Sequence, residues 1–260
     1  MLRHPLAHRS GYTCIEPGQF SRTMKTNERI SGEADELKKE EDALFAKWPT
    51  PPGARIVRDG VMDAVGYLSH QGPKMLFVLK EANDPGGGGW GLRDHVLGPQ
   101  CGAKTWDNVT RWKRVVDAWH TGAPIAGLWE DRLANLSLKD RGSELRDVAI
   151  VNMKKVPGGS RASMSAIYQA ARDDHAFLKE QFDLLNPDVV VVCGSDPAHY
   201  PYLLESGKRR LWKQVSAEVQ AMRWPMNGRD RVVVRTWHPQ ASVNARHMAE
   251  SLYRALSSVK

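Results

Sequence analysis

The sequence predicts an α/β fold, a three-layer sandwich with a central, mostly parallel sheet of four strands. Short apolar runs without polar alternation recur along the chain, which is typical of strands buried on both faces of a sheet. Longer segments with apolar residues at helical spacing alternate with these runs. With 260 residues, of which 41% are hydrophobic, the chain is long enough for one such domain with a sizeable core.

Each of the predicted strands is too short to be a stable helix. They are Met75–Leu79, Val148–Val151, Asp188–Cys193 and Arg231–Thr236. The third run contains four consecutive valines, and β-branched side chains of this kind favour a buried strand.

Four segments have the apolar spacing of helices. They are Ser31–Trp48, Thr105–His120, Ser165–Leu185 and Ser242–Leu256. The second carries three tryptophans, Trp106, Trp112 and Trp119, which we expect in the core. Residues 1–30 are polar and have no pattern, so we expect a disordered extension there and a single domain over residues 31–260.

The chain is basic, and the excess of positive charge lies near its end. The formal net charge is +7, and residues 199–260 contain 11 Lys/Arg and 4 Asp/Glu, so that 11 − 4 gives the whole excess of +7. A basic surface attracts nucleic acid, anionic membranes or acidic substrates. A basic protein without such a partner is the alternative that charge alone leaves open.

Cysteine and hydropathy patterns restrict the compartment and the cofactors. The cysteines, Cys14, Cys101 and Cys193, are odd in number and form no CxxC pair, which favours a reducing cytoplasm over a disulfide scaffold. No apolar run approaches the roughly 20 residues of a membrane span. We therefore expect a cytoplasmic monomer with no membrane association, no metal and no cofactor.

Polar segments follow three of the predicted strands. They are Lys80–Asp84, Asn152–Lys155 and Trp237–Ser242. In parallel sheets, ligands bind beyond the carboxyl ends of the strands. The three segments are therefore expected to converge on one cleft.

Four segments together resemble the uracil-DNA glycosylase superfamily, and most closely its iron–sulfur type from bacteria and archaea. They are FVLKEANDPG (Phe77–Gly86), VAIVNMKKVPGGSRASMSAI (Val148–Ile167), LLNPDVVVVCGSDPA (Leu184–Ala198) and WHPQAS (Trp237–Ser242). They occur in the order of that family and cover the chain from about Met75 to its end. Two departures stand out: Lys80 replaces a usual glycine, and three cysteines cannot supply the four thiolates of a cluster.

The resemblance implies roles for the residues at the strand ends. His238 would donate a hydrogen bond to O2 of the departing base, and Asn152 would read the pyrimidine edge with its amide. Glu81 or Asp84 would orient water or offset the sugar cation, and the sequence does not separate the two. The structural alternatives are a histidine that caps the last helix, an asparagine that forms a turn, and solvated loop acids.

Further residues would contact the base or the DNA backbone. Trp90 and Asn83 are the other candidates for base binding. Lys154, Lys155, Ser160, Arg161, Ser242 and Arg246 are the candidate phosphate contacts, which a solvated surface explains nearly as well. The glycine run Gly86–Gly89 is not a Walker loop, because no Gly-Lys-Ser/Thr follows it.

The functional hypothesis is a monofunctional DNA glycosylase that leaves an abasic site. The superfamily commonly has tyrosine at the position of Asp84, so the resemblance implies a pocket open to a bulky C5-modified cytosine, hydroxymethylated or glucosylated, as in phage DNA. Anti-phage defence would be the role of such an enzyme. The alternatives are ordinary uracil repair, a non-catalytic nucleic-acid-binding member of the fold, and a nucleotide-metabolising enzyme that binds phosphate with the glycine run.

Overall fold

A single mixed sheet organises the part of the chain that the computed structural model describes, residues 17–98, 104–195, 212–226 and 228–260. Within these residues its order is β1-β3-β2-β4-β7-β6-β5. The strands are β1 (Gly60–Val61), β2 (Met75–Leu79), β3 (Val148–Asn152), β4 (Val189–Cys193), β5 (Lys213–Gln214), β6 (Gln220–Met226) and β7 (Arg229–Thr236).

The expected strands form the centre of the sheet, and β3, β2, β4 and β7 are parallel neighbours. The sheet is nevertheless larger and less parallel than predicted, since β1, β5 and β6 pair antiparallel at its two edges. The strands β1 and β5 have two residues each. The apolar residues of β6 are interrupted by Arg223 and Pro225. Both lie beyond the two residues of β6 that pair with β5, where β6 is itself the edge and proline is tolerated.

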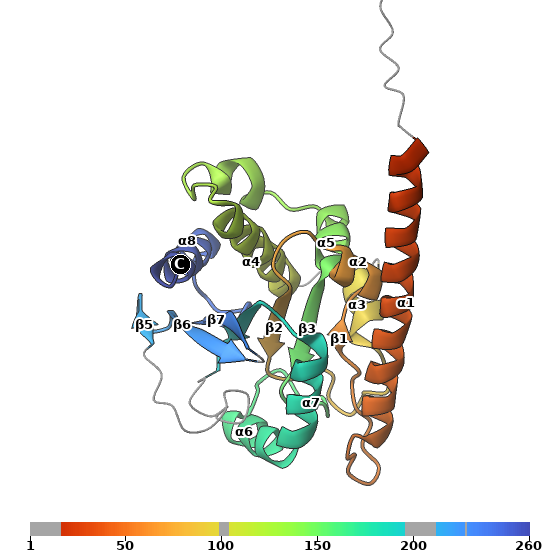
Figure 1. The fold of residues 1–260 in the computed structure, drawn as a ribbon. Coiled ribbons are helices and arrows are strands. Elements are labelled where there is room, and N and C mark those ends of the chain that lie inside the picture. The colour runs from red at the N-terminus through yellow and green to blue at the C-terminus, as the bar shows by residue number, and fades with distance from the viewer. Residues whose placement is uncertain (1–16, 99–103, 196–211, 227) are drawn as a thin grey trace, which may run out of the picture.

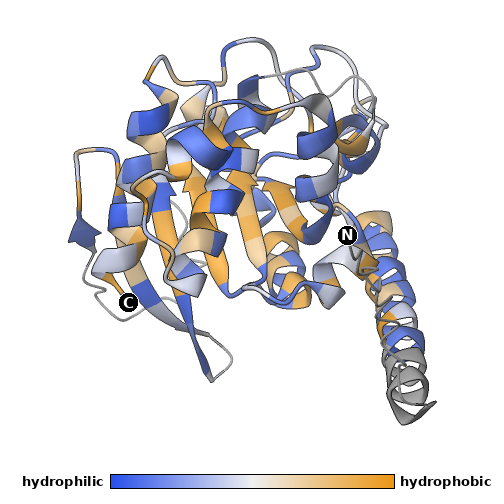
Figure 2. Ribbon diagram, turned by 90° about the horizontal axis from the view of Figure 1, so that it is seen from above, coloured by the Kyte–Doolittle hydropathy of each residue, from blue (hydrophilic) through white to orange (hydrophobic). Residues whose placement is uncertain are grey.

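Helices cover both faces of the sheet, which gives the expected three layers (Figures 1 and 2). Helices α4 (Lys104–Thr121) and α8 (Ala245–Ser258) pack on one face, with α3 (Leu92–Leu97) beside them. Helices α1 (Pro17–Lys47), α2 (Ala64–Ser69), α6 (Met164–Asp173) and α7 (His175–Leu185) pack on the other face. The tryptophans of α4 are buried, so their predicted place in the core is confirmed.

Two helices differ from the prediction. Helix α1 begins at Pro17 rather than Ser31, because polar residues without an apolar stripe still have good helix propensity and proline suits the first helical position. The expected disorder is therefore wrong for residues 17–30, and its remainder, residues 1–16, lies outside the described residues. The predicted helix Ser165–Leu185 is divided at Asp174, whose carboxylate accepts a hydrogen bond from the indole of Trp48 at 3.0 Å.

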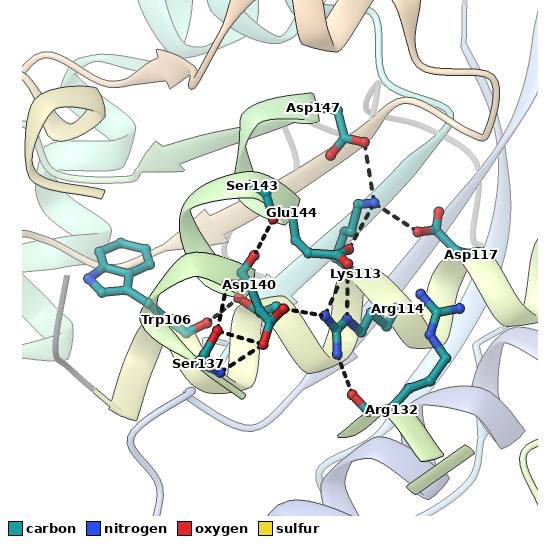
Figure 3. Close-up of polar contacts among 11 residues, drawn as sticks. Trp106, Lys113, Arg114, Asp117, Arg132, Ser137, Asp140, Ser143, Glu144 and Asp147 are labelled. Atoms are coloured by element: carbon teal, nitrogen blue, oxygen red, sulfur yellow. Dashed lines mark hydrogen bonds and ion pairs between the residues drawn. The ribbon is translucent and has the colours of Figure 1, made fainter. Parts of the chain in front are cut away.

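A cluster of charged side chains joins α4 to the short helices before β3 (Figure 3). These are α5 (Leu138–Glu144) and the 3₁₀ turn Leu145–Asp147, which follow the π-helical turn Trp129–Leu133. The ammonium of Lys113 contacts carboxylates of Asp117 (2.9 Å), Glu144 (3.3 Å) and Asp147 (3.2 Å).

The imidazole of His70 belongs to the same cluster, since it bridges the carboxylates of Asp117 and Asp147 at 3.5 and 2.7 Å. Because Asp147 precedes β3, the cluster lies at the amino end of that strand.

This cluster predicts a pH dependence of stability. Hydrogen bonds to Asp117 and Asp147 raise the pKa of His70 to about 9. A raised pKa in the folded state stabilises the fold fully below the ordinary value near 6.5, and this contribution is lost as the pH rises through 9. We expect wild type to lose about 1–2 kcal/mol from this group between pH 6.5 and 9, and His70→Gln to lose none of it. Urea unfolding at both pH values measures the difference.

The matched control is His120→Gln, which removes an exposed histidine from the same region, at the end of α4. Its free energy of unfolding should depend on pH as that of the wild type does. If the free energy of unfolding of His70→Gln has the same pH dependence, the protonated His70 does not stabilise the fold.

Candidate active site at the carboxyl edge of the sheet

The parallel strands bring the predicted polar segments to one edge of the sheet. Leu79 pairs with Asn152, Val78 with Val192, and Cys193 with Thr236, so the ends of β2, β3, β4 and β7 lie level. Strands β3 and β7 are separated by two others, which places Asn152 and the segment after Thr236 about 14 Å apart at the backbone.

The loops after β2 and β3 are joined to each other. Asn83 and Gly158 form a parallel bridge, in which the amide of Asp84 donates to Gly158 O and the amide of Gly158 donates to Ala82 O, both at 2.9 Å. A Cβ at position 158 would overlap the carboxylate of Glu81. A larger residue here would therefore displace the Glu81 carboxylate, and the bridging hydrogen bonds join the two loops into one surface.

Asp84 folds back onto its own loop. Its carboxylate accepts hydrogen bonds from the amide of Gly88 and the indole of Trp90, both at 2.8 Å. The indole bond, followed by the amide bond, lowers the pKa of Asp84. Trp90 is half-buried, with its ring 5.6 Å from that of His95. These contacts assign Asp84 and Trp90 a structural role, and their expected parts in catalysis and base binding remain predictions.

The glycine run leaves less open space than its composition suggests. Gly88 has a φ of +92°, and a Cβ there would overlap the carbonyl oxygen of Arg55. A Cβ at Gly87 would overlap the carboxylate of Asp84, whereas nothing lies near Gly86. The run serves mainly to let neighbouring chain approach the loop.

Glu81 and Lys154 form a partly buried ion pair. The Lys154 ammonium contacts the Glu81 carboxylate and also donates to Val156 O at 2.9 Å. Each side chain is thus engaged within the protein. A water-orienting role for Glu81 and a phosphate contact for Lys154 stay predictions, and either would compete with this pair.

Lys155 points into the protein rather than toward solvent. Its side chain is 1% exposed, and its ammonium donates to Asp59 at 2.6 Å and to Gln181 at 2.8 Å. The ring of Trp48 lies 4.8 Å from the same ammonium. The prediction that Lys155 contacts DNA is therefore wrong: a buried carboxylate holds this lysine.

Asn152 has the environment of a ligand-binding amide. It is 2% exposed, its backbone amide donates to Asp59 Oδ2 at 2.7 Å, and its Nδ2 has no hydrogen-bond partner among the described residues. A buried donor without a partner costs about 1–3 kcal/mol. A bound acceptor would remove that cost.

His238 is held as a neutral donor. Its Nδ1 accepts a hydrogen bond from the amide of Gln240 at 3.2 Å, so the proton of the neutral ring lies on Nε2. Burial, and secondly the charge of Lys80, lower the pKa of His238 to about 4. At neutral pH the ring therefore offers an uncharged N–H group.

Gly194 permits the close packing of the strand end against this histidine. It has a φ of +69°, and a Cβ at this position would lie 2.6–2.8 Å from atoms of His238. The alternative in which His238 caps the last helix is wrong, since Asn244 accepts hydrogen bonds from the amides of Arg246 and His247 and is the N-cap of α8.

The other predicted contacts lie on the surface. Asn83, Ser160, Arg161 and Ser242 are exposed. Arg246 is exposed but neutralised by Glu130 at 2.6 Å and Glu250 at 2.8 Å, so it adds little net positive charge. Their roles toward DNA stay predictions.

Sequence reasoning missed three buried polar groups. Asp59 orients both Asn152 and Lys155, and no pattern around it marks this role. The hydroxyls of Ser195 and Thr236 are buried and, within the described part of the chain, have no hydrogen-bond partner. Ser195 lies two residues beyond the apolar strand β4 and Thr236 ends the apolar strand β7, and these places were the available signal.

No protein-family model matches the chain, and neither does any curated protein. No helix within the described residues combines the length and apolar character needed to cross a membrane. The described residues also contain no group of three or more His, Cys, Asp or Glu side chains arranged to hold a metal ion.

Proposed function

We propose that the protein is a monofunctional DNA glycosylase that hydrolyses the N-glycosidic bond of a flipped-out pyrimidine. The observation that carries the proposal is that Asn152 and His238 lie at the same edge of the sheet. One is a buried amide whose donor has no partner among the described residues, and the other is a neutral imidazole with its N–H available. The four sequence segments that resemble the uracil-DNA glycosylase superfamily support the same assignment.

The chemistry follows from the charge that develops as the bond breaks. The electron pair of the C1′–N1 bond moves onto the base while the sugar becomes cation-like, and water then adds to C1′. A neutral N–H donor stabilises the negative charge that develops at O2 of the base in the transition state more than it stabilises the uncharged base of the bound substrate. His238 is assigned this role, and Asn152 is assigned the pyrimidine edge.

We propose a bulky C5-modified cytosine, hydroxymethylated or glucosylated, as the substrate. The support is at Asp84, which stands where the superfamily commonly has tyrosine and which folds back onto Gly88 and Trp90. If Asp84 occupies the place of that tyrosine, such a side chain leaves the space beside C5 free. Excision of these bases would attack modified phage DNA and spare unmodified host DNA. Ordinary uracil repair is the second candidate, favoured by the superfamily as a whole.

The test is incubation of the purified protein with oligonucleotides that carry one uracil, hydroxymethylcytosine or glucosylated hydroxymethylcytosine, in single and double strands. Alkali then cleaves at any abasic site. We expect abasic sites at the glucosylated base, their formation slowed roughly 10²-fold or more by His238→Ala, and no covalent adduct on borohydride reduction. Binding without abasic sites would instead assign a non-catalytic role, and activity on free nucleotides alone would assign nucleotide metabolism.

Asp84→Tyr tests the substrate directly. We expect it to lower excision of the glucosylated base by roughly 10-fold or more, because a single extra methylene in a pocket is worth about 1–3 kcal/mol and tyrosine adds more bulk than that. Asp84→Ala is the matched control: it also removes the bonds to Gly88 and Trp90 but adds no bulk. Equal losses in the two variants, or full activity of Asp84→Tyr, would count against an open C5 space.

A further inference from the structure

Lys80 lies at the centre of the candidate site. It is the first residue after β2, and β2 stands between β3, which carries Asn152, and β4, which packs against His238 through Gly194. Its backbone is fixed, since its carbonyl oxygen accepts the amide of Lys154 at 2.9 Å. The side chain of Lys80 is half-buried.

The ammonium of Lys80 differs in its partners from those of Lys154 and Lys155, the other two lysines at this edge of the sheet. Lys154 is paired with Glu81, and Lys155 with Asp59. Within the described residues, Lys80 has neither a salt bridge nor a side-chain hydrogen bond. Burial accordingly lowers the pKa of Lys80, and the nearby Cys193 and Glu81 oppose this shift only in part. A half-buried cation without a salt bridge of its own is costly to maintain, and a ligand that carries negative charge would remove that cost.

Buried polar groups around Lys80 also lack partners. In the described part of the chain, Asn152 Nδ2, Ser195 Oγ and Thr236 Oγ1 are buried without a hydrogen bond. Asn152 ends β3 and Ser195 lies two residues beyond β4, the two strands that flank β2, and Thr236 ends β7, the next strand beyond β4. Because buried polar groups are normally satisfied, these three point to a polar ligand at this edge.

We propose that Lys80 is a further catalytic residue, whose ammonium stabilises the negative charge that the departing pyrimidine acquires. The inference rests on the proposed glycosylase function. When the C1′–N1 bond breaks, both electrons go to the base; water adds its oxygen to C1′, and the proton it loses ends on the base. Lys80 neither gains nor loses a bond in this step. The same charge helps to keep His238 neutral, so that the imidazole acts only as a donor.

The test compares Lys80→Met with Lys80→Arg in single-turnover excision and in DNA binding. We expect Lys80→Met to lower the rate roughly 10²-fold with Kd changed less than about 2-fold, and Lys80→Arg, which keeps the charge, to recover most of the rate. The loss should be larger for hydroxymethylcytosine than for formylcytosine, since the formyl group already stabilises the leaving anion. NMR titration of the DNA-free proteins should give His238 a higher pKa in Lys80→Met than in wild type, where it is about 4, because the variant lacks the charge of Lys80.

The matched control is Lys179→Met, which removes an exposed lysine of α7 that pairs with Asp183. It should behave as wild type in every arm. A wild-type enzyme that excises no base contradicts the proposed function itself, whereas an active wild type with an equally active Lys80→Met contradicts only this inference. A weaker Kd with a salt slope lower by about 1 would make Lys80 a phosphate contact and overturn the catalytic role.

Discussion

Replacing His238 by alanine is expected to lower the single-turnover rate of base excision by roughly 10²–10³-fold, because one transition-state donor is typically worth about 2.7–4 kcal/mol. DNA binding should persist, since phosphate contacts dominate affinity and His238 is not one of them. Asn152→Ala should cost roughly 10²-fold by the same reasoning. Rates from rapid-quench experiments and Kd values from fluorescence anisotropy separate the two effects.

The pH profile gives an independent check on the state of His238. With a pKa of about 4, the ring remains neutral as the pH falls from 8 to 5, so no loss of rate in this range should come from its protonation. Gln240→Ala is the matched control for the mutant. The bond to Nδ1 comes from the backbone amide of Gln240, and removal of the side chain should leave the rate unchanged. Near-normal activity of His238→Ala would remove this residue from the site.

Lys155→Met is expected to destabilise the fold by about 3–5 kcal/mol, because it leaves the carboxylate of Asp59 buried without its cation. The double variant Lys155→Met with Asp59→Asn should recover part of this loss, since it removes both charges. Urea unfolding at pH 7 measures the free energies. The exposed pair of Lys47 and Glu180 provides the control, and Lys47→Met should change stability by no more than about 1 kcal/mol.

The same variant should also lower activity, because Asp59 fixes the backbone of Asn152. A Lys155→Met protein that unfolds at the denaturant concentration of the wild type would show that the buried pair does not contribute to stability. Loss of DNA affinity without loss of stability would instead restore the surface role that the sequence predicted for this lysine.

The central sheet was predictable from sequence because its strands are continuous apolar runs, and the run of valines in β4 has no competing interpretation. The edge strands were not predictable, since Gly60–Val61 and Lys213–Gln214 carry no periodicity. The convergence of Asn152 and the segment around His238 followed from topology alone. The states of Lys154 and Lys155 did not: the two are adjacent and chemically equal, and the inward turn of Lys155 depends on Asp59, 96 residues away in the chain.

The bridge between Asn83 and Gly158 has a consequence for engineering the specificity of this protein. The two loops that border the candidate site exchange backbone hydrogen bonds beyond the ends of their strands, so the conformation of each loop depends in part on the other. A loop transplanted alone from a protein with another base preference would have to place its backbone to match the hydrogen-bonding groups of the loop that stays. Grafts should therefore exchange residues 80–91 and 153–163 as a matched pair, and libraries should vary both segments together.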